Sequence, residues 1–497
     1  MRNYLKLIRH EGNASLFLAL ETSVISLLAG RPIHVHVEGL RGTGKTTIIR
    51  GARSILPSIE RIKGCIYNCD PRAPHCPEHR GLSEGDIARI GTEEIDMPFL
   101  EISHAAKIGT VVGTLDLSRM VDRIRPEAAL LPGILPRANR GIVFIDEINR
   151  LADTSPELTD ILLDIMGTKP GRLQVEEAGF QSFEIPVNLC VWAASNPDEE
   201  PGALEDIRRQ LSDRFDFTVS MGRPSELNIV REILTLSEQE PGDDGNDLGP
   251  EIEVFRSIIA QRAARYGDVR MGDDLRSLLA EIYVDFGLES LRAIESIALG
   301  AKARAVFEGR DTVTGNDLMR VLSLALRHRA DMSTLSSIAK FLEERLGQQR
   351  SDQRSEGGPT TSPGDGRLND PHEIMRALSP GGKMAPRERD SSRDNPNGLI
   401  ERFMSGMGLD RLFKAREHGQ YTAGGSGAGG LDGSVFAKDD PTGDPFRRGS
   451  ETHARSQAPQ VSPPPDISVT SPPEKARRIS SLPGENLIFT EEDLRGK

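Results

Sequence analysis

The hydrophobic residues before residue 224 follow two periodicities in turn. Segments with apolar residues at helical spacing alternate with short apolar runs that have the length of strands. The first run alternates branched apolar residues with His34 and His36, whereas the next two are almost continuously apolar, as in strands covered on both faces. The predicted strands are 33–39, 141–147, 187–197 and 215–221, the predicted helices are 14–30, 45–56, 156–167 and 203–215, and a hairpin is predicted at 171–186. This alternation favours an α/β fold of three layers with a parallel sheet.

Residues 224–346 carry helical periodicity only. The predicted helices are 225–238, 252–266, 290–309 and 316–330. We therefore expect an α/β domain at 1–223, with a cysteine-containing insert at 63–80, followed by a small all-helical domain at 224–346.

The chain changes character again after Leu346. The last 151 residues hold 21 of the 49 glycines and 15 of the 32 prolines, which accounts for an apolar content of only 37% in the whole chain. Such a composition buries too little apolar surface to offset the entropy lost on ordering, so a largely disordered tail is predicted at 347–497. One stretch, 397–419, has apolar residues at helical spacing. It is either a helix that docks onto a partner or a transient helix in the tail.

The totals exclude several classes of protein. A formal charge of −13 argues against sequence-independent nucleic-acid binding, which needs a basic surface. No apolar stretch reaches the roughly 20 residues that span a bilayer, and the N-terminus lacks the features of a signal peptide. Four cysteines in 497 residues are too few for a disulfide framework. We expect a cytoplasmic protein without a membrane span.

The segment "GLRGTGKTT" (39–47) matches the phosphate-binding pattern G-x-x-x-x-G-K-[ST] and lies between a predicted strand and a predicted helix. Its glycines allow backbone N–H groups to point at phosphate oxygens, Lys45 can reach the outer phosphates, and the Thr46 hydroxyl can bind Mg²⁺. The predicted nucleotide-binding residues are Gly39, Gly42, Thr43, Gly44, Lys45, Thr46 and Thr47.

Three further polar residues follow buried strands. Asp146 and Glu147 end the run at 141–147, and Asn196 ends the run at 187–197. Ligands of parallel sheets bind at the carboxyl ends of the strands, so Asp146 suits a Mg²⁺ site and Glu147 suits the base that activates the attacking water. The Asn196 amide can hold that water or contact the terminal phosphate. Together with Lys45, these residues predict ATP hydrolysis.

Two arginines are candidates for stabilising the charge that develops during phosphoryl transfer. Arg214 lies in "LSDRF" and Arg292 in "ESLRAIES". An arginine can neutralise the equatorial oxygens of the transferred phosphoryl group. Taken alone, either arginine is better interpreted as an ordinary ion-pair partner, and only the accompanying motifs favour the other role.

The set of motifs, in this order, resembles the AAA+ ATPases, and in detail the ATPase subunit of magnesium chelatase and its MoxR-like relatives. The more specific stretches are "KGCIYNCDP", "KIGTVVGTLDL", "PGILPRANRGIVFIDEINRL", "LTDILLDIM" and "DLMRVLSLALRHR". The similarity covers residues ~30–330.

The resemblance implies a role for each candidate residue. Lys45, Thr46, Asp146 and Glu147 correspond to the Walker residues, and Asn196 corresponds to sensor 1. Arg214 corresponds to the arginine finger that acts on a neighbouring subunit, with Arg208 as a second such candidate. Arg292 corresponds to sensor 2 of a helical lid. These assignments imply a homo-oligomeric ring, commonly a hexamer, with ATP and Mg²⁺ at the subunit interfaces.

The resemblance also implies a partner subunit with an integrin-type metal-binding domain. The signature of that domain is only weakly imitated here, by "DISVT" (466–470) among prolines, so the chain is interpreted as the motor and not as the partner. Two functions stay open: Mg²⁺ insertion into a porphyrin, or MoxR-like remodelling of a protein target. A scaffold that binds ATP without hydrolysing it is disfavoured by Glu147, Asn196 and Arg214.

The stretch "KGCIYNCDPRAPHCPEHR" (63–80) holds three of the four cysteines. Cys65, Cys69, Cys76 and His79 form a Cys₃His set that suits tetrahedral Zn²⁺, with His75 competing for the fourth position. Free buried thiols and a redox-sensitive pair are the alternatives. A closed site of this kind would shape a loop and not perform catalysis. The fourth cysteine, Cys190, is predicted to lie in the core.

Overall fold

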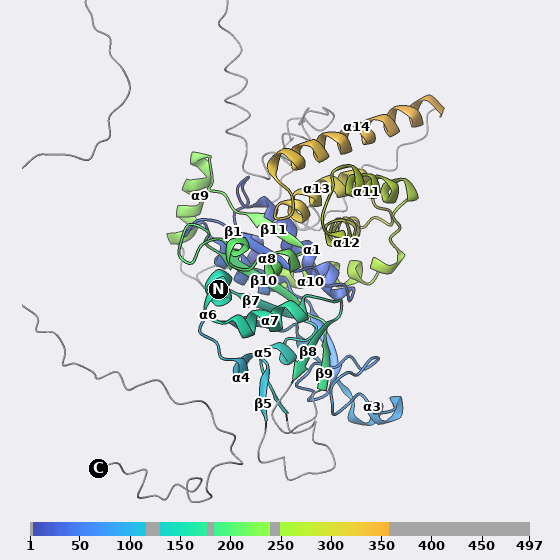
Figure 1. Cartoon of the computed structure of the whole chain (residues 1–497). Coiled ribbons are helices and arrows are strands. Elements are labelled where there is room, and N and C mark those ends of the chain that lie inside the picture. The colour runs from blue at the N-terminus through green and yellow to red at the C-terminus, as the bar shows by residue number, and fades with distance from the viewer. Residues whose placement is uncertain (1–2, 116–129, 176–182, 239–248, 357–497) are drawn as a thin grey trace, which may run out of the picture. The chain divides into compact units, whose positions relative to one another are not determined.

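The computed structural model describes residues 3–115, 130–175, 183–238 and 249–356. A five-stranded sheet with the order β11-β1-β10-β7-β4 forms its centre (Figure 1), and every pair of neighbouring strands is parallel. The strands are β1 (Val35–Glu38), β4 (Phe99–Ile102), β7 (Ile142–Ile145), β10 (Cys190–Ser195) and β11 (Phe217–Ser220). The four strands predicted from apolar runs are therefore confirmed. The edge strand β4 was missed because it is short and carries Glu101.

Successive side chains of each strand enter two different hydrophobic cores, because strand residues alternate between the faces of a sheet. Phe144 and Trp192 face one core, whereas Val143, Ile145 and Val191 face the other. Helices cover both faces, which confirms the three-layer α/β architecture.

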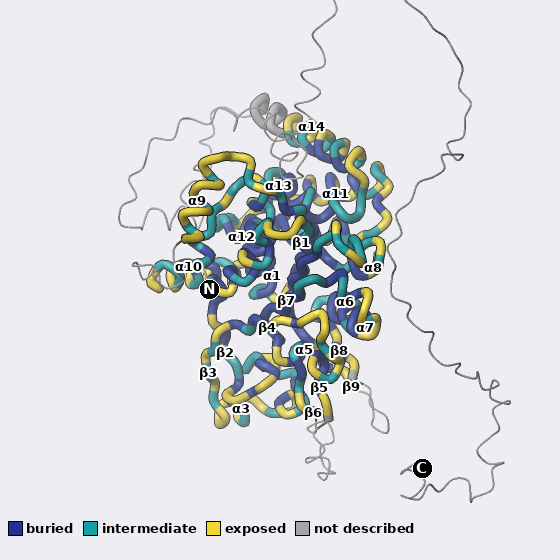
Figure 2. Tube along the Cα trace, turned by 90° about the vertical axis from the view of Figure 1, so that its left-hand side faces the viewer, coloured by how far each residue is buried: buried dark blue, intermediate teal, exposed yellow. Residues whose placement is uncertain are grey.

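The helices on the Phe144 face come from both ends of the described chain. They are α1 (Ala14–Leu28), α2 (Lys45–Gly51), α10 (Gly249–Ala263), α11 (Asp273–Asp285), α12 (Leu291–Phe307), α13 (Gly315–Leu326) and α14 (Met332–Glu356). The opposite face is covered by α5 (Ile134–Arg137), α6 (Ile148–Thr154), α7 (Pro156–Ile165) and α8 (Leu204–Arg214). Figure 2 shows the buried residues continuous from the sheet into α12 and α13.

Besides the central sheet, the described residues form three antiparallel strand pairs. The predicted hairpin is confirmed as β8 (Gly171–Val175) and β9 (Phe183–Val187). The other two pairs were not expected: β2 (Ser58–Ile62) with β3 (Thr92–Asp96), and β5 (Gly113–Leu115) with β6 (Leu130–Pro132). The cysteine-rich stretch lies between β2 and β3, together with the short helix α3 (Glu84–Ile90). A short helix α4 (Ile108–Val111) precedes β5.

In the described residues after 224, helices are the only regular elements, as predicted, beginning with α9 (Leu227–Glu238). Two details differ. Helix α11 was missed, although its buried residues Leu275, Leu278, Leu279 and Ile282 have helical spacing. Helix α14 continues past Leu346 to Glu356, so the first ten residues of the predicted tail are helical.

Several expectations concern residues beyond the described ranges. The segments 357–497, including 397–419 and 466–470, lie outside them. Within the described ranges, no helix is long and apolar enough to cross a membrane.

Candidate functional site

The predicted nucleotide-binding residues meet at the carboxyl edge of the sheet. The loop 39–47 leaves β1, Asn196 follows β10, and Asp146 and Glu147 follow β7. These three strands are neighbours in the order β1-β10-β7 and run parallel, so their carboxyl ends lie side by side. The tertiary structure therefore brings together residues that are about 150 positions apart.

Lys45 is the centre of this group. The residue is buried, with only 7% of its surface exposed. Its Nζ donates hydrogen bonds to the carbonyl of Leu40, at 2.9 Å, and to Oδ1 of Asn196, at 2.7 Å. The carbonyl of Gly39 accepts a third. Burial lowers the pKa of Lys45, while the carboxylates of Asp146 and Glu199 act in the opposite direction.

The loop has the backbone that its glycines allow. Gly42 and Gly44 have φ values of 74° and 90°, in the left-handed region that residues with a Cβ rarely adopt. A Cβ at Gly39 would lie 2.9 Å from the carbonyl oxygen of Met221. Thr43 donates from its hydroxyl to the Leu40 carbonyl at 2.9 Å, which closes the loop on itself.

Two residues with Mg²⁺-binding chemistry are in contact. The Thr46 hydroxyl donates to Oδ2 of Asp146 at 3.1 Å. Both residues are half-buried, whereas Thr47, the last residue of the motif, is exposed on α2. A hydroxyl and a carboxylate are oxygen ligands of the kind that Mg²⁺ prefers.

Glu147 sits at the point where β7 turns into α6. Its backbone is left-handed, with φ 56° and ψ 48°. Its carboxylate lies 3.4 Å from Arg150 and 3.8 Å from His104. Sequence reasoning did not select these two residues, although the spacing of Arg150, three positions after Glu147 on a helix, is a signal for contact.

Asn149 and Glu199, which the sequence analysis did not select, hold the segment after β10 in place at the same edge of the sheet. Asn149 donates from Nδ2 to the carbonyl of Gly202 at 3.0 Å and to that of Asn196 at 3.4 Å. Glu199 forms ion pairs with Arg41 at 2.5 Å and with Arg150 at 3.4 Å. These contacts fix the segment after β10, which carries Asn196.

Arg214 and Arg292 lie together, but not at this edge. Arg292 donates from Nη2 to the carbonyl of Gly167 at 3.0 Å, and the Arg214 guanidinium lies beside the same glycine. Burial lowers the pKa of Arg214, and the positive charge of Arg292 lowers it further. Two neighbouring guanidinium groups thus form a local concentration of positive charge.

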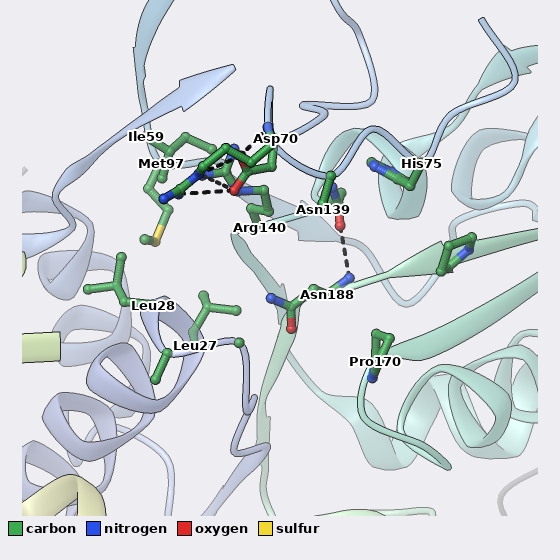
Figure 3. A pocket seen from close by; sticks show the side chains of 15 residues that line it. Leu27, Leu28, Ile59, Asp70, His75, Met97, Asn139, Arg140, Pro170 and Asn188 are labelled. Atoms are coloured by element: carbon green, nitrogen blue, oxygen red, sulfur yellow. Dashed lines mark hydrogen bonds and ion pairs between the residues drawn. The ribbon is translucent and has the colours of Figure 1, made fainter. Parts of the chain in front are cut away.

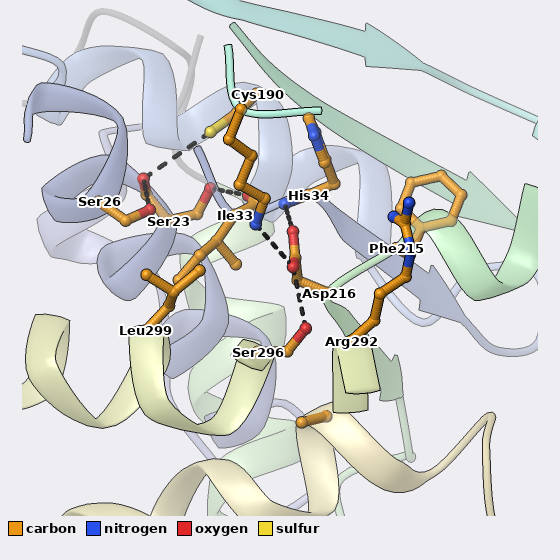
Figure 4. A network of polar contacts seen from close by, with 12 residues as sticks. Ser23, Ser26, Ile33, His34, Cys190, Phe215, Asp216, Arg292, Ser296 and Leu299 are labelled. Atoms are coloured by element: carbon orange, nitrogen blue, oxygen red, sulfur yellow. Dashed lines mark hydrogen bonds and ion pairs between the residues drawn. The ribbon is translucent and has the colours of Figure 1, made fainter. Parts of the chain in front are cut away.

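The pair is on the amino-edge side of the sheet. Arg214 ends α8, and two residues later Asp216 immediately precedes β11. Asp216 accepts hydrogen bonds from the backbone N–H of His34, which precedes β1, at 2.9 Å, and from Ser296 of α12, at 2.9 Å (Figure 4). Because β1 and β11 are parallel, Arg214 and Arg292 are separated from the Lys45 loop of their own chain by the length of the strands.

Arg208, the second candidate, interrupts α8. Its φ and ψ of −146° and 77° are not helical, and its guanidinium lies 3.5 Å from Asp160 of α7. Within the described part of the chain, its side chain pairs with Asp160 and not with the Lys45 group or Arg214.

The four candidate zinc ligands converge in the insert. The ligand atoms of Cys65, Cys69, Cys76 and His79 all lie within 4.8 Å of one another, and all four residues are buried. Hydrogen bonds from the Cys69 and Cys76 thiols lower the pKa of Cys65, whereas the contacts with Cys65 and Cys69 raise that of Cys76. Cys190 is fully buried in β10, as predicted.

The insert rests on the chain segment that leads into β7. Asn68 donates from Nδ2 to the carbonyl of Arg137 at 2.7 Å, and Asn139 donates to the carbonyl of Tyr67 at 3.1 Å. Asn139 in turn accepts from the backbone N–H of Asn188 at 2.8 Å, beside a cavity of about 460 Å³ (Figure 3). The insert is thus at the amino edge, away from Lys45.

The fold and the site define a class of protein. A parallel sheet of this strand order, a glycine-rich phosphate loop after β1, carboxylates after β7 and a helical region after the sheet are the features of an AAA+ ATPase. A model of the AAA lid domain matches residues 276–345.

The sequence relatives give the family. The chain is 32% identical over 298 residues to the magnesium-chelatase 38 kDa subunit of Acidiphilium rubrum, covering 59% of this chain and 81% of that protein. It is 31% identical over 337 residues to the magnesium-chelatase subunit ChlI of Mesostigma viride, covering 66% of this chain and 88% of that protein. The chain belongs to the family of magnesium-chelatase ATPase subunits.

A solved structure of the complex between the BchI and BchD subunits of magnesium chelatase includes a chain that is 25% identical. The match covers 67% of this chain and 98% of that chain, with a TM-score of 0.36. The relatives themselves favour the chelatase-like interpretation over the MoxR-like one.

Proposed function

We propose that this chain is the ATP-hydrolysing motor subunit of a magnesium chelatase-like complex, in which ATP binding and hydrolysis drive a conformational change in a partner subunit. The observation that carries the proposal is the convergence of Lys45, Asp146, Glu147 and Asn196 at one edge of the sheet, in a chain of this family.

The loop suits the phosphates of ATP. Its glycine backbone leaves N–H groups free of side-chain obstruction at Gly42 and Gly44, and Lys45 supplies a positive charge beside them. The acceptors that Lys45 now contacts are all uncharged oxygens, so an anionic phosphate would compete well for its ammonium group.

The residues present also suit Mg²⁺, which magnesium-chelatase ATPase subunits use with ATP. Thr46 and Asp146 would hold the ion, since their oxygens are already adjacent. Bound Mg²⁺ would neutralise charge on the phosphate oxygens.

Glu147 is the residue we assign as the general base. Its carboxylate is half-buried and lies at the carboxyl edge, and it is oriented by Arg150 and His104. From this position it can accept a proton from a water molecule, while the Asn196 amide orients that water or contacts the terminal phosphate.

Arg214 and Arg292 support assembly into a homo-oligomeric ring. They are grouped at the amino edge of the sheet, away from their own Lys45, which supports an action on the nucleotide of a neighbouring subunit. A head-to-tail contact of this kind closes into a ring, for which we propose the hexamer. Arg208 is a second residue that could act across the interface.

The substrate and the partner are proposed from the resemblance to magnesium-chelatase subunits, whose names are those of the relatives. We propose that the complex inserts Mg²⁺ as substrate into a porphyrin, and that an integrin-type metal-binding domain on the partner receives the conformational change. We place the complex in the cytoplasm. The chain would supply the ATPase motor and not the porphyrin-binding surface.

The substitution Glu147→Gln tests the site. It keeps the size and polarity of the side chain but removes the base, so we expect ATP hydrolysis to fall by about 10²–10³-fold while ATP still binds. Phosphate release and equilibrium nucleotide binding would be measured on both proteins. Glu344→Gln, on the exposed surface of α14, is the matched control and should keep full activity. Equal hydrolysis rates in wild type and Glu147→Gln would refute the assignment.

A further inference from the structure

We propose that the insert at 63–80 binds one structural Zn²⁺ ion through Cys65, Cys69, Cys76 and His79. The four ligand atoms come from residues spread over fifteen positions and lie within 4.8 Å of one another. The proposal concerns a site at the amino edge of the sheet and does not depend on the nucleotide site.

The distances suit a tetrahedral ion. Zn²⁺ binds sulfur at about 2.3 Å and imidazole nitrogen at about 2.0–2.1 Å, so tetrahedral ligands are separated by roughly 3.6–3.8 Å. Sγ of Cys65 lies 4.0 Å from Sγ of Cys76, and Sγ of Cys76 lies 3.0 Å from Nδ1 of His79. Shifts of about half an ångström would bring both pairs to the expected separation.

The positions of the two histidines favour His79 over His75 as the fourth ligand. His79 is 8% exposed, and its ring nitrogen is close to all three sulfurs. His75 is not in that group; its Nδ1 lies 3.3 Å from Cys69. His79 is therefore the fourth ligand, and His75 lies outside the first coordination sphere.

The surroundings suit bound thiolates. The backbone N–H groups of His75 and Cys76 both point at Sγ of Cys69, at 3.4 and 3.3 Å. Such bonds stabilise negative charge on sulfur and orient the ligand. No disulfide joins the four cysteines, all of which lie in described residues.

Four buried protein ligands leave no open position, so the ion would be structural. On binding, Zn²⁺ replaces the protons of the three thiols, which pass to solvent, and no electron transfer takes place. The cluster lies directly beside Asn68, which is bonded to Arg137 ahead of β7. Zinc would thus fix the insert onto the segment that leads into β7, the strand that Asp146 and Glu147 follow.

The test uses the full chain, purified under reducing conditions without a metal-binding tag or chelator. We expect about one zinc per chain in wild type by elemental analysis. Cys69→Ser and Cys76→Ser should lose most of it. Cys190→Ala removes a buried cysteine in β10 and is the matched control, which should retain the wild-type zinc content.

Cobalt substitution reports on the ligand atoms directly and is carried out first on the wild-type protein. We expect the intense visible bands of tetrahedral Co²⁺ and a sulfur-to-cobalt charge-transfer band. His79→Ala should change this spectrum, whereas His75→Ala should leave it unchanged.

Three outcomes would overturn the proposal. One is wild-type protein with neither zinc nor the cobalt bands. The second is a Cys65–Cys76 disulfide found by mass spectrometry in freshly purified protein. The third is a spectrum that responds to His75→Ala and not to His79→Ala, which would overturn the ligand set.

Discussion

At the scale of single residues, a buried charged group at one edge of the sheet lacks a charged partner in contact among the described residues, whereas a buried charged group at the other edge has one. At the carboxyl edge, Lys45 contacts uncharged oxygens, and burial lowers its pKa. At the amino edge, Asp216 is buried but has a full set of partners, among them Lys169 at 2.7 Å. Burial alone would raise the pKa of Asp216, but Lys169, His34 and the hydrogen bonds lower it to about 2. The ammonium group at the first edge is poised to bind an anion, whereas the Asp216 carboxylate at the second is already neutralised by its partners.

Asp216→Asn should therefore destabilise the protein. The carboxylate has a pKa of about 2 in the folded state and an ordinary value near 3.8, a difference that corresponds to roughly 2 kcal/mol of stability at neutral pH. We expect the free energy of unfolding to fall by about that amount at pH 7, measured by urea denaturation. Asp268→Asn, at an exposed position, is the control and should change it by less than about 0.5 kcal/mol.

The loss of stability in Asp216→Asn should depend on pH in a defined direction. A carboxyl group whose pKa is depressed by folding stabilises the folded state above its unfolded pKa, and that contribution is lost as the pH falls through the folded pKa. The deficit of Asp216→Asn should hence stay constant from pH 7 to about 5 and shrink between about 4 and 2. A deficit that is independent of pH down to 3 would mean that packing, and not the charge, is responsible.

At the scale of elements, the contact between the helical region and the sheet depends on a missing side chain. Gly300 lies in α12, where a Cβ would be 2.5 Å from Cζ of Phe217 in β11 and 3.3 Å from Cγ1 of Val321 in α13. Phe217 is fully buried, so its ring has little room to move. The close approach of helix to strand is therefore set by the glycine.

Gly300→Ala should destabilise the protein, although alanine is the better helix former. Overpacking costs about 1–3 kcal/mol, and the gain in helix propensity offsets up to about 1 kcal/mol of it. The control is Gly347→Ala in α14, where a Cβ would meet no atom within 4 Å and only the gain applies. Thermal unfolding should show a lower Tm for the first variant and an equal or higher Tm for the second. Two equal shifts would argue against tight packing at Gly300.

At the scale of the whole molecule, the separation of Arg214 from Lys45 predicts complementation between subunits. Glu147→Gln damages the nucleotide side of a subunit interface, and Arg214→Ala damages the arginine side. If the arginine acts on a neighbour, a mixed ring contains interfaces in which both sides are intact. With random mixing of equal amounts, up to about a quarter of the interfaces in the rings are intact on both sides. An equimolar mixture of the two inactive variants should regain ATPase activity.

The control mixture combines Glu147→Gln with Lys45→Ala. Both changes affect the nucleotide side, so no interface is intact and no activity should return. Activity in neither mixture would indicate that Arg214 acts within its own subunit or has only a structural role.

Much of this architecture could be predicted from the sequence. Continuous apolar runs identified β7 and β10, and the glycine-rich loop, Asp146, Glu147 and Asn196 followed from their position after predicted strands. These features are local: a buried strand needs apolar residues, and a phosphate loop needs glycine and lysine at fixed spacing. Short strands such as β4 were missed because four residues with one charge leave little periodic signal.

Only the tertiary structure decided how these pieces are arranged. Strand order placed Lys45 against Asn196, 151 positions away, and put Arg214 and Arg292 on the opposite side of the sheet. Folding of the insert selected His79 over His75, a choice that spacing left open. The physical reason is that the spacing of apolar residues reflects whether each position is buried or exposed, which is a local property. Strand order and the closing of loops determine which distant residues come into contact.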